Sequence, residues 1–157
     1  KTNDTIVEIG IKKGRTTFLL ANALQEAGLN AIVIGIDPHY DAQQNILGFI
    51  EKKKVVFRKK SSFDVAKEMT KPVGLVFVDG CHCEACCAAD IKAWRDLVAP
   101  GGFLVFHHVT KDGTPMPEPP HAGTKHGVCA AIKRSNLNGY EVVEHVHGGH
   151  MRVYRRK

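Results

Sequence analysis

The sequence has no run of about 18 apolar residues, so no segment has the length and hydropathy of a membrane-spanning helix. Its polar N-terminus leads directly into a predicted strand, which is not the pattern of a secretory signal. The five cysteines are odd in number and four of them crowd into residues 81–87, so they do not form a disulfide framework. We therefore expect a cytoplasmic protein with no membrane partner.

Aromatic residues are also scarce, at 7% of the 157 residues, whereas basic residues outnumber acidic ones by 22 to 16. The basic residues gather at 52–54, 58–60 and 155–157. Such clusters can mark a surface that binds nucleic acid or an anionic substrate. Alternatively, they are a solvated helix end, an edge strand whose lysines prevent pairing with another chain, and a charged tail. The second interpretation is favoured, because no aromatic residue is interleaved with the charges to stack on bases.

Apolar periodicity predicts strands that alternate with helices. The strands are expected at 5–10, 31–36, 55–58, 74–79 and 103–106, with a terminal hairpin at 141–146 and 150–154. The helices are expected at 15–28, 41–53, 63–70, 84–98 and 127–137, and the loop at 110–126 is long enough for a lid. This order predicts one α/β domain over residues 1–157, a three-layer sandwich around a mostly parallel seven-stranded sheet with an antiparallel C-terminal hairpin strand.

The first predicted strand runs into the pattern Glu8-x-Gly10-x-x-x-Gly14-x-Thr16. Glycine lets the backbone turn and approach a ligand closely, and the helix after it directs unpaired N–H groups to the same place. Neither a dinucleotide-binding nor a P-loop glycine pattern is present. The pattern resembles the first motif of class I S-adenosylmethionine-dependent methyltransferases, which implies that Glu8, Gly10 and Gly14 bind this cofactor. The pair Thr16 and Thr17 is expected to cap the helix.

Two further positions extend the expected cofactor site. Asp37 ends the second strand, about 20 residues or more past the glycine turn, where a carboxylate can accept both ribose hydroxyls. Its alternative role as a helix cap is less favoured because of the glycine turn. Ser62 follows the third strand, where class I methyltransferases place side chains beside the adenine, although a simple helix cap explains it equally well.

The order of later motifs is more specific. The fourth strand ends in Asp79-Gly-Cys-His82, followed by Asp90-Ile-Lys-Ala-Trp94, by Pro-Gly-Gly at 100–102 and by a strand ending in His107-His108. This order resembles the small class I family that includes the macrocin and rhamnosyl O-methyltransferases, with D-G-D-H, D-[IL]-x-x-W, P-G-G and H-D. The resemblance covers essentially the whole chain. It implies a Rossmann-like fold and methylation of a small-molecule hydroxyl, on a sugar or a glycosylated metabolite. That family usually carries N-terminal helices over the cofactor, and we expect them to be missing here.

The resemblance also implies roles at the strand ends. Asp79 would contact the cofactor and ligate a divalent metal together with His107 and His108, and His82 would be the general base. The chemistry agrees, because a metal lowers the pKa of a hydroxyl and histidine accepts a proton near neutral pH. Two carboxylates of the family pattern are replaced here, by Cys81 and His108. If a metal binds, zinc, iron or manganese should therefore be preferred over magnesium.

The cysteines pose a separate question. Cys83-x-x-Cys86 has the spacing of one zinc knuckle, but zinc sites usually pair two such knuckles. Cys86 and Cys87 also fit buried helix positions that accept a small apolar side chain. Two interpretations of these cysteines therefore stay open, a metal cluster and the start of a helix at which thiols serve as small packed side chains.

Three functions follow from these observations. The leading one is a methyltransferase acting on a small-molecule hydroxyl. A nucleic-acid methyltransferase is the second, although the fourth strand lacks the Asn/Asp-Pro-Pro-aromatic turn of enzymes that methylate exocyclic base amines. The third is a non-catalytic cofactor-binding homologue that has lost its metal carboxylates. The sequence does not identify the acceptor, and a homo-oligomer is compatible with it.

Overall fold

The computed structural model describes residues 5–51, 55–110, 127–146 and 150–157. Its strands are β1 (Thr5–Ile9), β2 (Ile32–Ile36), β3 (Val55–Arg58), β4 (Val73–Val78), β5 (Val98–His107), β6 (Tyr140–Val146) and β7 (Met151–Arg156). Its helices are α1 (Arg15–Glu26), α2 (Tyr40–Asn45), α3 (Leu47–Glu51), α4 (Ser62–Glu68), α5 (Glu84–Trp94) and α6 (Val128–Arg134). None of these described helices combines the length and hydropathy needed to cross a membrane.

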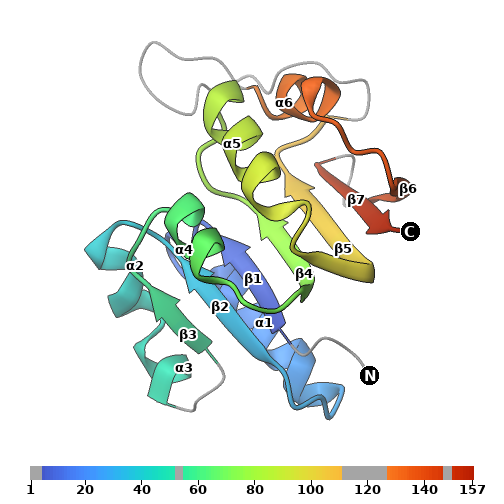
Figure 1. The fold of residues 1–157 in the computed structure, drawn as a ribbon. Helices are drawn as coiled ribbons and strands as arrows, with labels where there is room; N and C mark the ends of the chain where they lie inside the picture. Colours follow the sequence, from blue (N-terminus) through green and yellow to red (C-terminus); the bar gives the residue numbers. More distant parts are fainter. Residues whose placement is uncertain (1–4, 52–54, 111–126, 147–149) are drawn as a thin grey trace.

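The strands form one sheet in the order β3-β2-β1-β4-β5-β7-β6 (Figure 1). β1 to β5 are parallel, whereas β7 runs antiparallel between β5 and β6. This confirms the expected mostly parallel, seven-stranded sheet with an antiparallel C-terminal hairpin. The chain moves outward from β1 to β3 and then returns to build β4 and β5 on the other side of β1. The junction of β1 and β4 is therefore the topological switch point, where open α/β sheets bind ligands.

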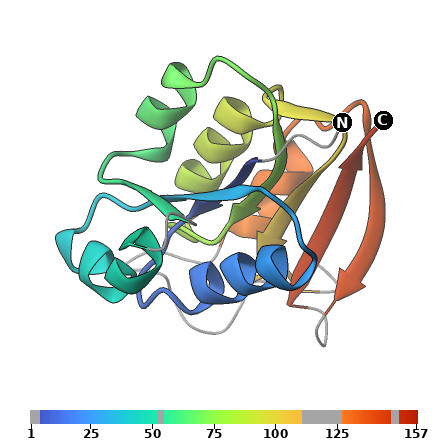
Figure 2. The same ribbon diagram turned by 90° about the horizontal axis from the view of Figure 1, so that it is seen from below.

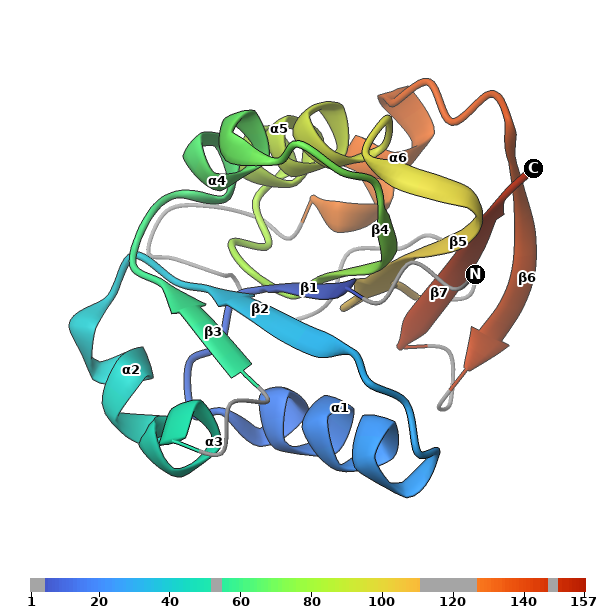
Figure 3. The ribbon, with the colours of Figure 1, turned by 60° about the horizontal axis from the view of Figure 1, so that its bottom comes forward.

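Helices cover both faces of the sheet, and Figures 2 and 3 show α4, α5 and α6 on one side and α1, α2 and α3 on the other. Each face has its own buried cluster. One holds Ile91 and Trp94 of α5, both fully buried, and the other holds Leu24 of α1 and Ile46. Because the central strands are covered on both sides, they read as nearly continuous Val and Ile runs rather than alternating ones.

Several predicted boundaries differ from the structure, most of all those of α5 and β5. α5 ends at Trp94 rather than near residue 98, and Val98 already begins β5, which continues through Pro100, Gly101 and Gly102. The register between β4 and β5 shifts between Val73 and Leu75. The Pro-Gly-Gly segment at 100–102 therefore forms an irregularity inside β5 and does not separate a helix from a strand. The helix expected at 41–53 is two short helices, and residues 52–54 lie outside the described part, as do residues 111–126 of the predicted lid.

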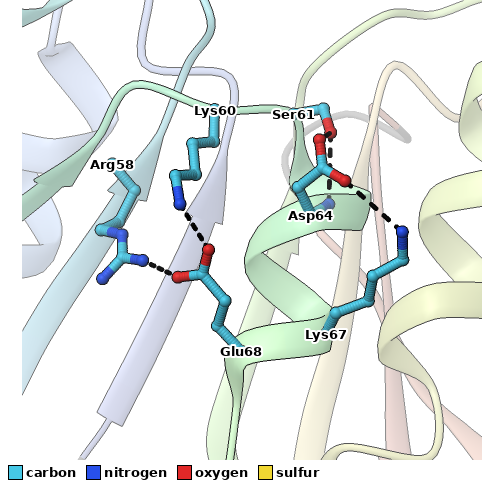
Figure 4. A network of polar contacts seen from close by, with 6 residues as sticks. All are labelled: Arg58, Lys60, Ser61, Asp64, Lys67 and Glu68. Carbon is cyan, nitrogen blue, oxygen red and sulfur yellow. Dashed lines mark hydrogen bonds and ion pairs between the residues drawn. The ribbon is translucent and has the colours of Figure 1, made fainter.

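The basic cluster at 58–60 is partly paired within the chain (Figure 4). Arg58 and Lys60 both contact the carboxylate of Glu68 in α4, the lysine at 2.5 Å. Lys67 lies 3.5 Å from Asp64 on the same helix. Exposed pairs of this kind stabilise a fold by only about 0–1 kcal/mol each. They do neutralise part of the cluster, which favours its interpretation as a solvated surface.

Candidate active site

The glycine turn after β1 is seated against the end of β4. Gly10 has a φ of 90°, and a Cβ built on it would lie 2.3 Å from the carbonyl oxygen of Asp79 and 2.7 Å from the Cα of Gly80. No side chain fits at that distance, so glycine is required by the neighbouring backbone. Gly14 closes the turn at a φ of 72° and is the N-cap of α1, without a side-chain hydrogen bond. The N–H groups of the first turn of α1 therefore face the turn without a side-chain cap.

Glu8 lies fully buried beneath this turn. Its Oε2 accepts a hydrogen bond of 2.5 Å from the hydroxyl of Thr17, which is also fully buried. The expectation that Thr16 and Thr17 cap α1 is therefore wrong, because Gly14 is the cap and Thr17 turns toward the buried acid. Among the described residues Glu8 Oε1 has no hydrogen-bond partner.

The pKa of Glu8 is raised to about 7. Burial is the main cause, and the negative charges of Asp79 and Asp37 add to it, while the bonds from Thr17 oppose it. Near neutral pH this carboxyl group is therefore poised between its two protonation states. A cation placed at the turn would favour the ionised form.

Asp37, at the end of β2, holds the glycine turn from the other side. Its Oδ2 accepts the N–H groups of Ile11 and Lys12 at 3.1 and 3.0 Å, and its Oδ1 accepts the N–H of His39 at 2.9 Å. Lys12 has a φ of 50°, a left-handed conformation that these hydrogen bonds stabilise. Asp37 thus shapes the turn, and Oδ1 retains capacity to accept a further hydrogen bond.

Three imidazoles surround the carboxylate of Asp79. His82 Nε2 and His107 Nδ1 each lie 3.1 Å from Oδ1, and His108 Nε2 lies 3.6 Å from the same atom. Consecutive strand residues normally point to opposite faces. His108 follows β5 with a φ of 55°, which turns the chain so that both histidines reach one oxygen.

The electrostatics of Asp79 differ sharply from those of Glu8. Burial alone would raise the pKa of Asp79, but hydrogen bonds from His107 and His82 and the charges of His107 and His108 outweigh it and hold the pKa at about 2. Asp79 is therefore ionised at any physiological pH. The ring of His108 packs between its neighbours, with centroids 3.9 Å from His82 and 4.2 Å from His107.

Ser62 lies in the first turn of α4, and its hydroxyl donates a hydrogen bond to Asp90 of α5. Ser61 caps that helix, accepting the N–H of Asp64 at 3.2 Å. Burial raises the pKa of Asp90 to about 6, against the opposing hydrogen bond from Ser62. Ser62 thus joins two helices here, and its predicted contact with adenine stays a prediction.

Comparison with known proteins identifies the family of the chain. The model of a family described as a methyltransferase domain matches residues 7–109, which include the glycine turn, Asp37, Asp79 and the histidine pair. The chain belongs to this methyltransferase-domain family. It is an S-adenosylmethionine-dependent methyltransferase of class I, with the Rossmann-like fold of that class.

Solved structures share the fold at low sequence identity. Fibrillarin from Aeropyrum pernix, solved with natively bound S-adenosyl-L-methionine, is 16% identical with a TM-score of 0.71, over 99% of this chain and 67% of that one. The N-methyltransferase NodS from Bradyrhizobium japonicum is 15% identical with a TM-score of 0.69, over 99% and 86%. An O-methyltransferase family protein from Burkholderia thailandensis is 17% identical with a TM-score of 0.66, over 98% and 50%.

The residues around the glycine turn fit S-adenosylmethionine. Glu8, Asp37 and Asp79 bring three carboxyl groups to one place, and Glu8 Oε1 is buried without a donor among the described residues. A cofactor with an ammonium and a sulfonium would compensate this negative charge. Its carboxylate would suit the N-terminus of α1, which has no side-chain cap. Sequence reasoning missed Thr17 as the partner of Glu8, although a Thr nine residues after a strand acid was visible.

The raised pKa of Glu8 predicts a pH-dependent stability of the cofactor-free protein. A carboxyl group whose pKa rises from 4.5 to about 7 on folding favours the folded state most at low pH. This stabilisation is lost as the pH rises toward 7, by about 3 kcal/mol in total. Glu8→Gln should remove this contribution, so the free energies of unfolding of parent and variant should diverge between pH 5 and pH 8.

Urea unfolding at both pH values measures the difference. Glu26→Gln, at an exposed position at the end of α1, is the matched control and should follow the parent. Parallel pH profiles for Glu8→Gln and the parent would show that Glu8 is not desolvated in the folded protein.

Proposed function

We propose that this enzyme methylates a hydroxyl group of a small molecule, a sugar or a glycosylated metabolite, as macrocin and rhamnosyl O-methyltransferases do. One observation carries the proposal. The carboxylate of Asp79 is contacted by three imidazoles. It lies directly beside the glycine turn, because Gly10 packs against the backbone of Asp79. A hydroxyl is a poor nucleophile until its proton is removed, and imidazole is the side chain best suited to remove it near neutral pH.

The glycine turn and Asp37 would bind S-adenosylmethionine, with its amino-acid end near residues 8–14 and its ribose on Asp37. The cofactor supplies an electrophilic methyl group on a sulfonium. Asp37 Oδ1 accepts one main-chain N–H and can accept a ribose hydroxyl as well. The acidic surroundings of the turn, set by Glu8, Asp37 and Asp79, stabilise positive charge there.

His82 would act as the general base. Its Nε2 faces the ionised carboxylate of Asp79, which orients the ring and stabilises it once it has taken up the proton. The remaining task of the protein is to hold the acceptor oxygen in line with the methyl group. The neighbouring ends of β4 and β5 supply a rigid frame for that alignment.

Asp79, His107 and His108 are the residues that would hold a divalent metal, which would lower the pKa of the acceptor hydroxyl. Ligand atoms of Asp79, His82 and His108 all lie within 4.8 Å of one another. One carboxylate among imidazoles suits zinc, iron or manganese, whereas magnesium prefers oxygen ligands. Removal of His108 should then weaken the metal with either ligand set, and comparison of His107→Ala with His82→Ala shows which of these two histidines completes the site.

Binding measurements on Asp37→Ala test the ribose contact. Loss of a hydrogen bond to a charged group costs about 1.5–3 kcal/mol, so affinity for S-adenosylhomocysteine should fall at least about tenfold. Because the change also releases the N–H groups of Ile11 and Lys12, the 2′-deoxy analogue provides the control. The substitution Asp37→Ala should reduce the affinity for this analogue clearly less than it reduces the affinity for S-adenosylhomocysteine. An equal loss of affinity for both ligands would show that Asp37 does not bind the ribose.

Turnover with methyl-labelled S-adenosylmethionine tests the acceptor and the base. Hydroxylated glycosides should receive the label as an ether, and RNA should not. His82→Ala should lower kcat by about 100-fold or more while leaving cofactor affinity within about twofold of the parent. The parent's kcat should rise with pH as the general base loses its proton, and the variant should lose this rise.

His39→Ala, at an exposed histidine that makes no capping hydrogen bond, is the control and should keep the parent's kcat. Labelling of RNA alone would establish the nucleic-acid function instead. Tight cofactor binding without turnover on any acceptor would establish the non-catalytic one. Full activity in His82→Ala would exclude it as the base.

A further inference from the structure

Three cysteines converge beside the histidine cluster without belonging to it. Cys81 and Cys83 lie in the loop between β4 and α5, and Cys86 lies in the first turn of α5. The sulfurs of Cys81 and Cys83 are 3.3 Å apart, and all three sulfurs lie within 4.8 Å of one another. All five cysteines of the chain are described, and none forms a disulfide.

Core packing does not account for these three thiols. Cys87, the next residue on α5, is fully buried in the cluster that contains Trp94, as expected of a small apolar side chain. Cys86 was expected to be buried in the same way, but it is exposed, and Cys81 and Cys83 are only half-buried. The side chains face one another at the protein surface rather than the core.

The spacing of the sulfurs matches that of ligands around one metal ion. A zinc–sulfur bond of about 2.3 Å places tetrahedral thiolate ligands about 3.8 Å apart, and a trigonal copper(I) site separates them by a similar distance. The 3.3 Å between the sulfurs of Cys81 and Cys83 is slightly shorter than this value, and none of the three separations exceeds 4.8 Å. Thiolates are soft ligands that select zinc and copper(I) over magnesium, calcium or manganese.

The start of α5 stabilises negative charge on the sulfur of Cys83. Cys83 is the N-cap of the 11-residue helix, and its sulfur accepts the N–H of Cys86 at 3.5 Å. The positive end of the helix dipole faces the same sulfur. Three thiolates around a metal ion carry excess negative charge, and this end of α5 compensates part of it.

We propose that Cys81, Cys83 and Cys86 form a binding site for one thiophilic metal ion, zinc or copper(I), with three protein ligands. For zinc, the fourth position would be left to an exchangeable ligand. The site is separate from the Asp79 cluster, since the Nε2 of His82, between two of the cysteines in sequence, faces Asp79. The bound ion would fix the loop that carries His82, whose carbonyl oxygen accepts the N–H of Gly127 at 2.9 Å.

Metal titration of the reduced chain, kept free of oxygen, tests this proposal. Zinc and copper(I) are each added in competition with a chromophoric chelator, and cobalt(II) reports sulfur ligation through its thiolate charge-transfer band. The parent should bind one ion at the thiols. Cys83→Ser keeps an oxygen that can cap α5, yet it should weaken binding at least about 100-fold, because metal affinity depends on each deprotonated ligand.

Three controls place the ion. Cys129→Ala removes a buried thiol outside the trio and should bind like the parent. Asp79→Asn and His82→Ala should also retain the thiolate band and the affinity. Tight binding of copper(I) alone supports a trigonal site, and tight binding of zinc supports a four-coordinate one.

Several outcomes would overturn the site. They are weak binding of both metals to the reduced parent, unchanged affinity in Cys83→Ser, or loss of the ion in Asp79→Asn with the cysteines intact. A metal confined to the Asp79 cluster would leave the proposed methyl transfer standing while refuting the thiolate site.

Discussion

The close approach of Gly10 to the backbone of Asp79 and Gly80 is the contact on which the rest of the site depends. β1 and β4 are neighbours at the switch point of the sheet, so the turn after β1 and the loop after β4 leave the sheet side by side. A Cβ on Gly10 would stand 2.3 Å from a carbonyl oxygen, so only glycine permits this arrangement. The glycine turn is thereby held against the backbone of Asp79, whose side chain contacts the three histidines.

Charge is distributed unevenly across that contact. Glu8, which has no cationic partner among the described residues, has a pKa raised to about 7, whereas Asp79 among three imidazoles has a pKa lowered to about 2. One carboxyl group is thus responsive to a cation, while the other is permanently ionised and orients His82. The division of labour fits an enzyme that binds a positively charged methyl donor on one side and removes a proton on the other.

Most of the architecture was predictable from the sequence, because alternating strands and helices leave few topologies with a parallel sheet. The glycine turn after the first strand was also predicted, and the structure places it at the switch point of the sheet. The Pro-Gly-Gly segment misled the prediction, since its irregularity is absorbed inside β5. Thr17 was misassigned as a cap because the sequence does not show which polar groups are buried.

The convergence of His107 and His108 on one oxygen illustrates a second limit. Strand alternation would separate two adjacent side chains, and only the left-handed backbone of His108 brings them together. The surface trio of cysteines was equally ambiguous, because spacing alone does not distinguish Cys86, which is exposed, from Cys87, which is buried. Both features depend on local backbone geometry that periodicity does not encode.

A crystal structure of the enzyme with S-adenosylhomocysteine tests the central claim most directly, namely that the glycine turn and the histidine cluster form one active site. We expect the ribose on Asp37, the amino-acid end against the turn at residues 8–14, and the sulfur facing His82 beside Asp79. A ligand bound away from the turn, or a sulfur directed away from His82, would contradict it.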